Sequence, residues 1–412
     1  MSKIIAGLDI GNGYVKGMAS EQTTGFVADI DLPSDVAYIM ATHDMKTGLD
    51  EAGDVINDIY NQMDVSFDSP LIKDKNRMLF GDRGIKSGNA VEEFDVCSPI
   101  SKAQQHLSYI LTLGCLAGMA LQDYWNSHKS LPTETIKVDA RVALALPIAE
   151  FKKYRTEYAN NYKSGKHTVT FHNFEQSIQV EISFEDVQVI AEGASAQYAI
   201  RSKGEGFVNA MLSEIRRMGE PLEGISAKDI MSATNTIGID IGEGTVNFPV
   251  FQSAVGKANG KFNPDVSLTF DKGYGAVLDD ARDRLQDAGY PFKSRKELQA
   301  FLNTVPNAMT RSRHEAVKKI VDEEISSFVM QVGMQFSKIM SRVGTFTEVI
   351  YVYGGGASPV KDELYPLVID KAKSFSGGEQ VACPILYLDS RYSRYLNREG
   401  LYEMARKVAE QA

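Results

Sequence analysis

Two segments with almost the same pattern, residues 7–17 and 238–248, recur in this chain of 412 residues. The first begins Gly-Leu-Asp-Ile-Gly-Asn-Gly and the second Gly-Ile-Asp-Ile-Gly-Glu-Gly. Each predicts a buried strand that ends in an aspartate, a tight Gly-x-Gly turn and a return strand rich in β-branched or aromatic residues. A single copy of this pattern could equally be an ordinary β-hairpin with glycines in its turn. Two copies indicate a fold of two similar halves.

The two predicted turns have the chemistry of a phosphate site. Glycines at alternate positions let the backbone turn tightly and leave its N–H groups open to phosphate oxygens. Asp9 and Asp240, each at the end of a strand, can orient a hydrated Mg²⁺. We therefore expect the halves to bind one nucleotide between them. The expected contacts are Gly11, Asn12, Gly13 and Tyr14 in the first turn, and Gly242, Glu243, Gly244 and Thr245 in the second.

Three further features could complete this site, and each has a structural alternative. Gly354, Gly355 and Gly356 follow a predicted strand and could lie flat against adenosine, or could simply end a strand in a loop. Lys16 would point back at the first turn and neutralise phosphate charge, or be a solvated strand lysine. Glu192 follows a strand and could position or deprotonate water, or complement a helix dipole.

Composition and charge narrow the possible functions. Hydrophobic residues make up 43% and charged residues 24% of the chain, as in soluble globular proteins, and no apolar run approaches the length of a membrane span. The three cysteines are far apart, which favours reduced thiols and a cytoplasmic location. The net charge of −10 and the lack of a basic run argue against direct DNA binding, so a basic adaptor would be the contact with DNA. There is no Walker A sequence, and the six histidines show no metal-ligand spacing.

The order of predicted elements indicates α/β layers in two lobes. We expect a first lobe at 1–235 with a small subdomain inserted at about 31–98. A second lobe would span 236–385, with a small subdomain at about 276–312, and residues 386–412 would pack back on the first lobe. Long helices are predicted at about 101–127 and 312–342 from their apolar spacing. The glycines and proline of 201–235 predict the connection between the lobes.

The ordered set of motifs resembles the actin-fold ATPases, and most of all the bacterial plasmid-segregation actins of the ParM (StbA) type. The resemblance spans the whole chain. Besides the second Asp-x-Gly-x-Gly-Thr segment, it is carried by residues 9–16 (Asp-Ile-Gly-Asn-Gly-Tyr-Val-Lys), 142–147 (Val-Ala-Leu-Ala-Leu-Pro), 189–193 (Val-Ile-Ala-Glu-Gly) and 352–357 (Val-Tyr-Gly-Gly-Gly-Ala).

This resemblance implies an actin-like, duplicated ribonuclease-H-like α/β fold with a nucleotide cleft between two lobes. It implies that Asp9 and Asp240 orient Mg²⁺, that Lys16 contacts phosphate, that Glu192 positions the attacking water and that residues 354–356 line the adenosine. Hydrolysis of ATP, or of GTP, would drive turnover of a filament of the chain itself. That filament would move plasmid DNA through an adaptor protein bound to a centromere-like site, with no membrane partner.

The chain departs from the family pattern in three places. Asn12 stands where many relatives have a small hydroxyl residue, so a side-chain contact to phosphate would be missing. Glu243 stands where glycine is common, which would bring a negative charge near the γ-phosphate unless it points outward. Extra length at 31–98 and 201–235 means that filament geometry does not carry over.

Two other functions stay open on the sequence. A small-molecule kinase of the same fold would need a catalytic aspartate beside a substrate pocket, and such kinases typically lack the lysine that Lys16 supplies. A cell-shape or division scaffold is the other alternative. Its membrane-bound members usually carry an amphipathic terminal helix, whereas residues 401–407 are short and mixed in character.

Overall fold

The computed structural model describes residues 1–39, 51–74, 76–95, 100–217, 222, 224–253, 260–376 and 383–411. The chain forms two compact units, Met1–Ser202 with Tyr395–Ala412, and Lys203–Arg394. The division therefore falls at 202/203 and 394/395, whereas the sequence placed it at 235/236 and 385/386. The two units are described separately below.

The segment expected to connect the lobes is largely helical. Helix α6 (Ala194–Arg217) continues through the first half of that segment and is kinked at Gly204, where φ is 74°. A short helix, α7 (Ala227–Ser232), follows with Ser226 and Asp229 forming a capping box. One boundary between the two units, at 202/203, falls within this segment, and Gly204 kinks the helix there without ending it.

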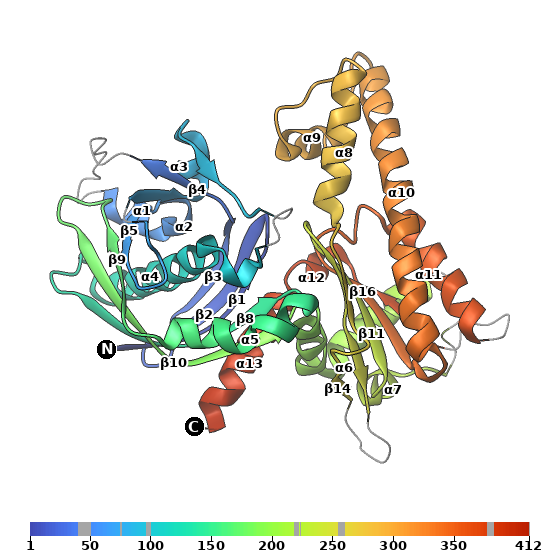
Figure 1. Cartoon of the computed structure of the whole chain (residues 1–412), viewed down its shortest axis with the longest axis horizontal. Helices are drawn as coiled ribbons and strands as arrows, with labels where there is room; N and C mark the ends of the chain where they lie inside the picture. Colours follow the sequence, from blue (N-terminus) through green and yellow to red (C-terminus); the bar gives the residue numbers. More distant parts are fainter. Residues whose placement is uncertain are drawn as a thin grey trace. The chain divides into compact units, whose positions relative to one another are not determined.

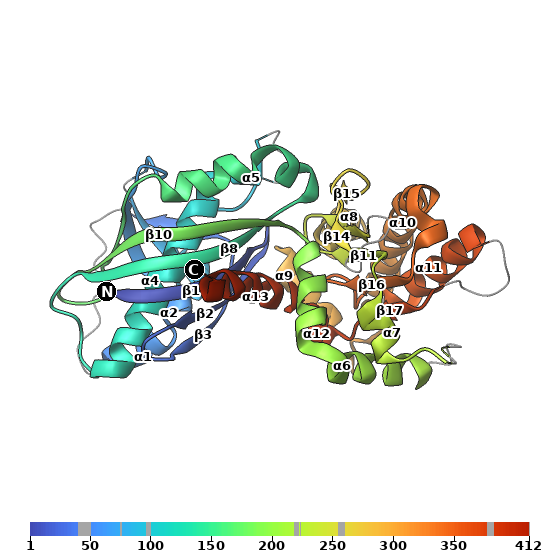
Figure 2. The same ribbon diagram turned by 90° about the horizontal axis from the view of Figure 1, so that it is seen from below.

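The first unit is built on a ten-stranded sheet (Figures 1 and 2). The predicted meander forms β1 (Ser2–Ile10), β2 (Tyr14–Glu21) and β3 (Val27–Pro33), and β1 is followed across the sheet by the parallel strands β8 (Ile136–Leu146) and β10 (Ile178–Ala191). The sheet continues through β9 (His167–Phe171), β5 (Asp64–Asp68), β6 (Arg77–Phe80), β4 (Val36–Ile39) and β7 (Val91–Glu92). The predicted hairpin over residues 167–190 is confirmed as β9 and β10.

The helices of the first unit include both long and short elements. The predicted long helix is α4 (His106–His128), and it contacts β1, β8 and β10, while α5 (Ile148–Lys163) packs on β8 and β10. Most of α4 is buried, on more than the one face that its sequence predicted. The short elements are α1 (Ala52–Asn57), α2 (Ile59–Gln62), α3 (Gly81–Lys86) and the 3₁₀ turn η2 (Lys102–Gln104).

The C-terminal helix α13 (Leu396–Gln411) packs on β1 and β8 of the first unit (Figure 2). Leu401 and Ala405 lie in one apolar cluster with Ile5 and Ala143. Gly7 makes this contact possible, because a Cβ there would lie 2.1 Å from the backbone nitrogen of Tyr402. The glycine that begins the first motif therefore lets the helix approach the strand.

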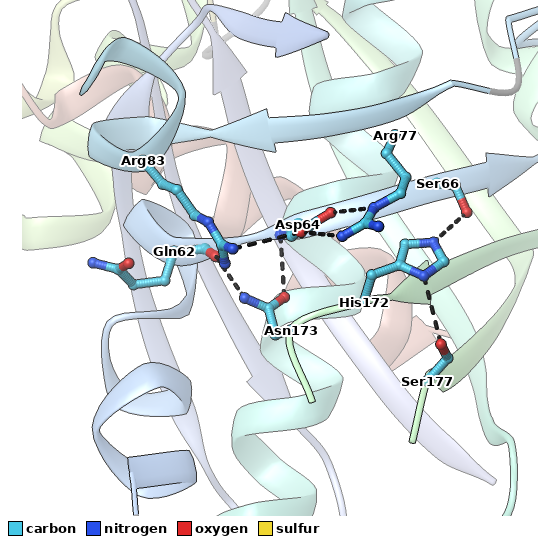
Figure 3. Close-up of polar contacts among 8 residues, drawn as sticks. All are labelled: Gln62, Asp64, Ser66, Arg77, Arg83, His172, Asn173 and Ser177. Carbon is cyan, nitrogen blue, oxygen red and sulfur yellow. Dashed lines mark hydrogen bonds and ion pairs between the residues drawn. The ribbon is translucent and has the colours of Figure 1, made fainter. Parts of the chain in front are cut away.

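Part of the first unit, between β5, β6, α3 and the β9–β10 connection, is held by a buried ionic network (Figure 3). The carboxylate of Asp64 accepts hydrogen bonds from Arg77 Nε at 2.9 Å and Nη2 at 2.5 Å, and Arg83 Nη2 lies 3.5 Å away. The Asn173 side chain donates to the Gln62 carbonyl and accepts from the Asp64 N–H. A buried carboxylate paired this completely fixes the relative positions of the four segments.

The second unit repeats the plan of the first. Strand β11 (Thr236–Ile241) pairs in antiparallel fashion with β12 (Val246–Phe248) and β13 (Val250–Gln252), and in parallel with β16 (Val349–Tyr353), which pairs with β17 (Ile385–Tyr387). The sheet ends at β14 (Lys261–Phe262) and β15 (Leu268–Phe270). An antiparallel return strand on one side of the aspartate-bearing strand and a parallel strand on the other occur in both units, which confirms the predicted duplication.

Helices α8 (Tyr274–Asp287), α10 (Arg311–Val343) and α11 (Lys361–Ser376) share one apolar core with this sheet. The helix predicted at 312–342 is α10, and its buried positions repeat at helical spacing through Val321, Phe328, Val332 and Phe336. Helices α9 (Arg295–Leu302) and α12 (Ser390–Ser393) complete the unit. Among the described residues, none of the helices combines the length and apolar character that crossing a membrane requires.

Candidate functional site

The first Asp-Gly hairpin joins β1 to β2 in a tight turn. Asp9 stands opposite Lys16 in the strand register. The Gly11 N–H donates to the carbonyls of Asp9 and Tyr14, both at 3.0 Å. A Cβ on Gly11 would lie 2.6 Å from the Tyr14 oxygen, so the turn requires glycine there. Asn12, Gly13 and Tyr14 are partly exposed around it.

Ser34 supports this turn from the residue that follows β3, and no motif in the sequence marks it. Its hydroxyl donates to the Gly11 carbonyl at 2.6 Å, and its N–H donates to the Gly13 carbonyl at 3.0 Å. These hydrogen bonds satisfy two carbonyls of the turn. They therefore fix the conformation of the turn from within the first unit.

Asp9 is a buried carboxylate without a hydrogen bond to any residue that the structure describes. Its side chain is 7% exposed. Burial raises the pKa of Asp9, the ammonium groups of Lys16 and Lys102 oppose that rise, and Glu192 adds to it. Such an anion, balanced by two lysines and lacking fixed donors, is suited to a hydrated cation.

Glu192 lies immediately after β10, and its N–H donates to the Leu146 carbonyl at 2.8 Å. Its carboxylate oxygen Oε1 accepts a hydrogen bond from Lys102 Nζ at 2.9 Å. The two side chains are only 13% and 5% exposed. The charges of Lys16, Lys102 and Glu192 all act on Asp9, so the structure brings these four side chains into one electrostatic cluster.

Lys102 was missed in the sequence because it precedes a helix in a stretch without any recognisable motif. Burial alone would lower the pKa of Lys102, but the charges of Glu192 and Asp9 outweigh it and raise that pKa. Lys102 lies in η2, whose N-cap Ser101 accepts from the Ala103 N–H and donates to Glu150 at 2.5 Å. The ammonium group is therefore charged and held by a short, capped turn.

The second Asp-Gly hairpin joins β11 to β12 with matching geometry. Asp240 is buried and stands opposite Asn247, where the first hairpin has a lysine. The Gly242 N–H donates to the Thr245 carbonyl at 2.9 Å, and Gly244 is partly exposed at the tip. The Thr245 hydroxyl accepts from the Asn247 side chain at 3.2 Å, which fixes its position beside the turn.

The carboxylate of Glu243 pairs with a cation. Arg295 Nη1 lies 3.3 Å from Glu243 Oε1, and the same guanidinium holds Asp279 through Nε at 2.7 Å. The Glu243 backbone carbonyl accepts from the Gly275 N–H at 2.8 Å. The negative charge that set this turn apart from its relatives is therefore balanced within the second unit.

The third glycine turn lies against the second hairpin. Gly354 has a φ of 100° and follows β16, and a Cβ there would lie 2.6 Å from Asp240 Oδ1. The Gly356 N–H donates to the Ile241 carbonyl at 2.8 Å, and a Cβ on Gly356 would lie 2.7 Å from Cβ of Tyr274. Gly355 has no atom within 4 Å of its Cβ position. The structure thus joins Asp240, residues 242–245 and residues 354–356 in one place.

Among the described residues, no group of three or more His, Cys, Asp and Glu side chains is arranged to hold a metal ion directly.

The family described as actin-like proteins, N-terminal domain, matches residues 7–194. None of the curated protein sequences matches the chain.

Solved structures match over the whole length. The ParM of a 15-stranded filament from Clostridium botulinum has a TM-score of 0.64 at 15% identity and covers 99% of this chain and 100% of its own. The actin-like protein Alp7A has a TM-score of 0.61 at 16% identity, covering 99% and 98%. Bacillus thuringiensis ParM with AMPPNP has a TM-score of 0.58 at 16% identity, covering 100% and 99%.

At these identities the structural likeness establishes the fold, and the sequence match to the N-terminal domain is independent of it. The duplicated plan of the two units agrees with both. Residues 7–194 match the actin-like family, and the chain as a whole has the actin-like fold of the ParM structures.

Proposed function

We propose that this chain binds ATP with Mg²⁺, hydrolyses it, and assembles with copies of itself into dynamic filaments that segregate plasmid DNA. The observation that carries the proposal is the cluster of Asp9, Lys16, Lys102 and Glu192 beside a glycine turn braced by Ser34. That cluster combines phosphate-binding backbone, balancing cations and a carboxylate for water.

Each residue has a definite task in this proposal. The N–H groups of residues 12–14 and 243–245 would bind phosphate oxygens, because those of Gly11 and Gly242 already donate within the turns. Lys16 would neutralise the phosphate charge. Asp9 and Asp240 would orient the waters of a Mg²⁺ ion. The positive charge of that ion would stabilise the negative charge that develops on the phosphates during transfer. Glu192 would hold the attacking water and accept its proton, with the hydrogen bond from Lys102 fixing the position of the carboxylate. Residues 354–356 would lie against the nucleoside.

The solved relatives support self-assembly and nucleotide binding. The Clostridium botulinum ParM structure is a filament, and the Bacillus thuringiensis ParM structure was solved with AMPPNP. In this chain ATP is the expected nucleotide, with GTP as the alternative. We expect the chain to work in the cytoplasm and to reach DNA through a basic adaptor on a centromere-like site, because its net charge is −10.

The test is ninety-degree light scattering after addition of Mg-ATP, with phosphate release followed in the same sample. The proposal expects scattering that rises and then decays as phosphate appears. Asp240→Ala should weaken both signals, because it removes a buried carboxylate that contacts the third glycine turn. Flat scattering with steady phosphate release would contradict filament assembly, and turnover stimulated by a sugar or carboxylic acid would identify a kinase. Scattering that persists without phosphate release would indicate a scaffold.

A further inference from the structure

A cavity of about 630 Å³ lies in the first unit, far from the glycine turns. It is lined by the start of β1, the β2–β3 turn, the C-terminal end of α4 and residues 133–137. Ser2 at this cavity and Asp9 at the glycine turn stand at opposite ends of β1, seven residues apart, or roughly 23 Å along a strand. The cavity is therefore separate from the proposed nucleotide site, and its volume is typical of small-ligand sites.

Asp123 gives this cavity its chemistry. Its side chain is 7% exposed, and its Oδ1 accepts a hydrogen bond from the Thr24 hydroxyl at 2.6 Å. Its second oxygen has no hydrogen-bond partner in the part of the chain that the structure describes. Burial raises the pKa of Asp123, the Thr24 hydrogen bond and the charge of His128 oppose that rise, and the nearby charge of Glu21 adds to it. A cation bound beside this carboxylate would offset both the cost of burying its charge and the repulsion from Glu21.

Glu21 supplies a fixed negative charge next to Asp123. Three backbone N–H groups donate to its carboxylate, from Lys3 at 2.9 Å and from Thr23 and Thr24 at 2.6 Å. Burial alone would raise the pKa of Glu21, but these bonds outweigh it and lower that pKa. Glu21 is thus an ionised carboxylate whose hydrogen bonds are made within the protein. Its negative charge favours a cation in the cavity that it lines.

The other walls suit an organic group. The rings of Tyr124 and His128 stack with centroids 4.1 Å apart at one side. The Ser2 hydroxyl is enclosed and makes no hydrogen bond with the described residues. Glu134 adds a third carboxylate to the lining. The lining also includes the positively charged side chain of Lys137, which is exposed.

We propose that this cavity binds an organic cation, whose primary ammonium or guanidinium group donates to the open oxygen of Asp123. Glu21 and Glu134 attract the cation, and the Tyr124–His128 pair contacts its alkyl or planar part. The same chemistry is presented by a free polyamine and by a lysine or arginine side chain of a protein partner.

The test is isothermal titration calorimetry on the full chain, with agmatine and putrescine as free cations and a lysine- and arginine-containing peptide as the side-chain source. The neutral control ligand is 1-pentanol. Asp123→Asn should weaken cation binding by roughly tenfold or more, since a hydrogen bond to a charged group is lost. Glu157→Gln, an exposed carboxylate of α5 that does not line the cavity, should leave binding unchanged.

A second variant shows whether a loss of binding in Asp123→Asn comes from misfolding. Ser127→Lys changes an exposed residue that lines the cavity and tethers an ammonium group beside Asp123. It should abolish cation binding while the thermal melt stays at the wild-type temperature. Binding of the small amines identifies a free ligand, and binding of the peptide alone identifies a protein partner. The proposal is overturned if neither binds at millimolar concentration, or if Asp123→Asn and Ser127→Lys bind as well as wild type.

Discussion

Lys102 Nζ lies 2.9 Å from Glu192 Oε1, and both side chains are almost fully enclosed. The pair places a charged lysine beside the carboxylate that we propose handles the attacking water, within the field of Asp9. A buried pair of this kind is costly to break from one side, because the remaining charge is left without its partner. Lys102 is therefore a positioning residue for Glu192.

We expect Lys102→Met to destabilise the first unit by about 3 kcal/mol, the scale of breaking a buried ion pair. The double variant Lys102→Met with Glu192→Gln should recover most of that loss, because no uncompensated carboxylate remains. Urea unfolding of the single and double variants measures this coupling. Strictly additive losses would show that the two charges do not interact.

Glu192→Gln should lower ATP-dependent phosphate release by roughly 10²-fold or more, the usual scale for losing a general base. Nucleotide binding should be kept, since the amide has the shape of the carboxylate. Glu157→Gln is the matched control on an exposed face of α5. Equilibrium binding of a fluorescent ATP analogue and phosphate release are measured side by side, and unchanged turnover in Glu192→Gln would remove Glu192 from the catalytic step.

Gly354→Ala and Gly355→Ala should differ sharply, although they are neighbours. At Gly354, φ is 100° and the added Cβ would meet Ile241 O at 2.4 Å and Asp240 Oδ1 at 2.6 Å, whereas at Gly355 it meets nothing within 4 Å. Gly354→Ala should therefore displace Asp240 and destabilise the second unit, whereas Gly355→Ala should unfold like the wild type in the absence of nucleotide. Equal unfolding midpoints for the two variants in urea would contradict the contact between the third turn and Asp240.

Asp64→Asn should cost about 3–5 kcal/mol, because it leaves the buried Arg77 and the partly exposed Arg83 without their carboxylate. Asp82→Asn is the control, since its pair with Lys86 is exposed on α3 and should be worth less than ~0.5 kcal/mol. Both are read from denaturant midpoints at constant slope. Similar midpoints for the two variants would mean that the network of Figure 3 does not stabilise the fold.

His167 should make stability fall in mild acid. Its ring is buried, with Nε2 donating to the Tyr162 carbonyl at 2.9 Å and Nδ1 accepting from the Ser69 hydroxyl at 2.8 Å, which is the neutral form. Burial lowers the pKa of His167 below 6.5, although the Tyr162 carbonyl opposes the shift. Because the unfolded chain binds the proton more readily, this stabilisation is complete above pH 6.5 and is lost as pH falls through the lowered pKa.

His167→Gln keeps a donor and an acceptor but cannot be protonated in this range. Its unfolding free energy should depend less on pH between about 6.5 and 4 than that of wild type. Urea unfolding at several pH values measures the slope. A slope equal to that of wild type would show that His167 does not titrate on unfolding.

The sequence by itself determined the duplicated α/β plan, because hydrophobic periodicity and paired Asp-Gly motifs are local patterns. Asp9, Asp240 and the three glycine turns could be found from it, and so could Glu192, since a motif marks each one. Only the tertiary structure placed Lys102 on Glu192 and Ser34 under the first turn, paired Glu243 with Arg295 and opened a cavity beside Asp123. These contacts join residues far apart in the chain through unmarked side chains. Their partners are set by packing, which no local spacing records.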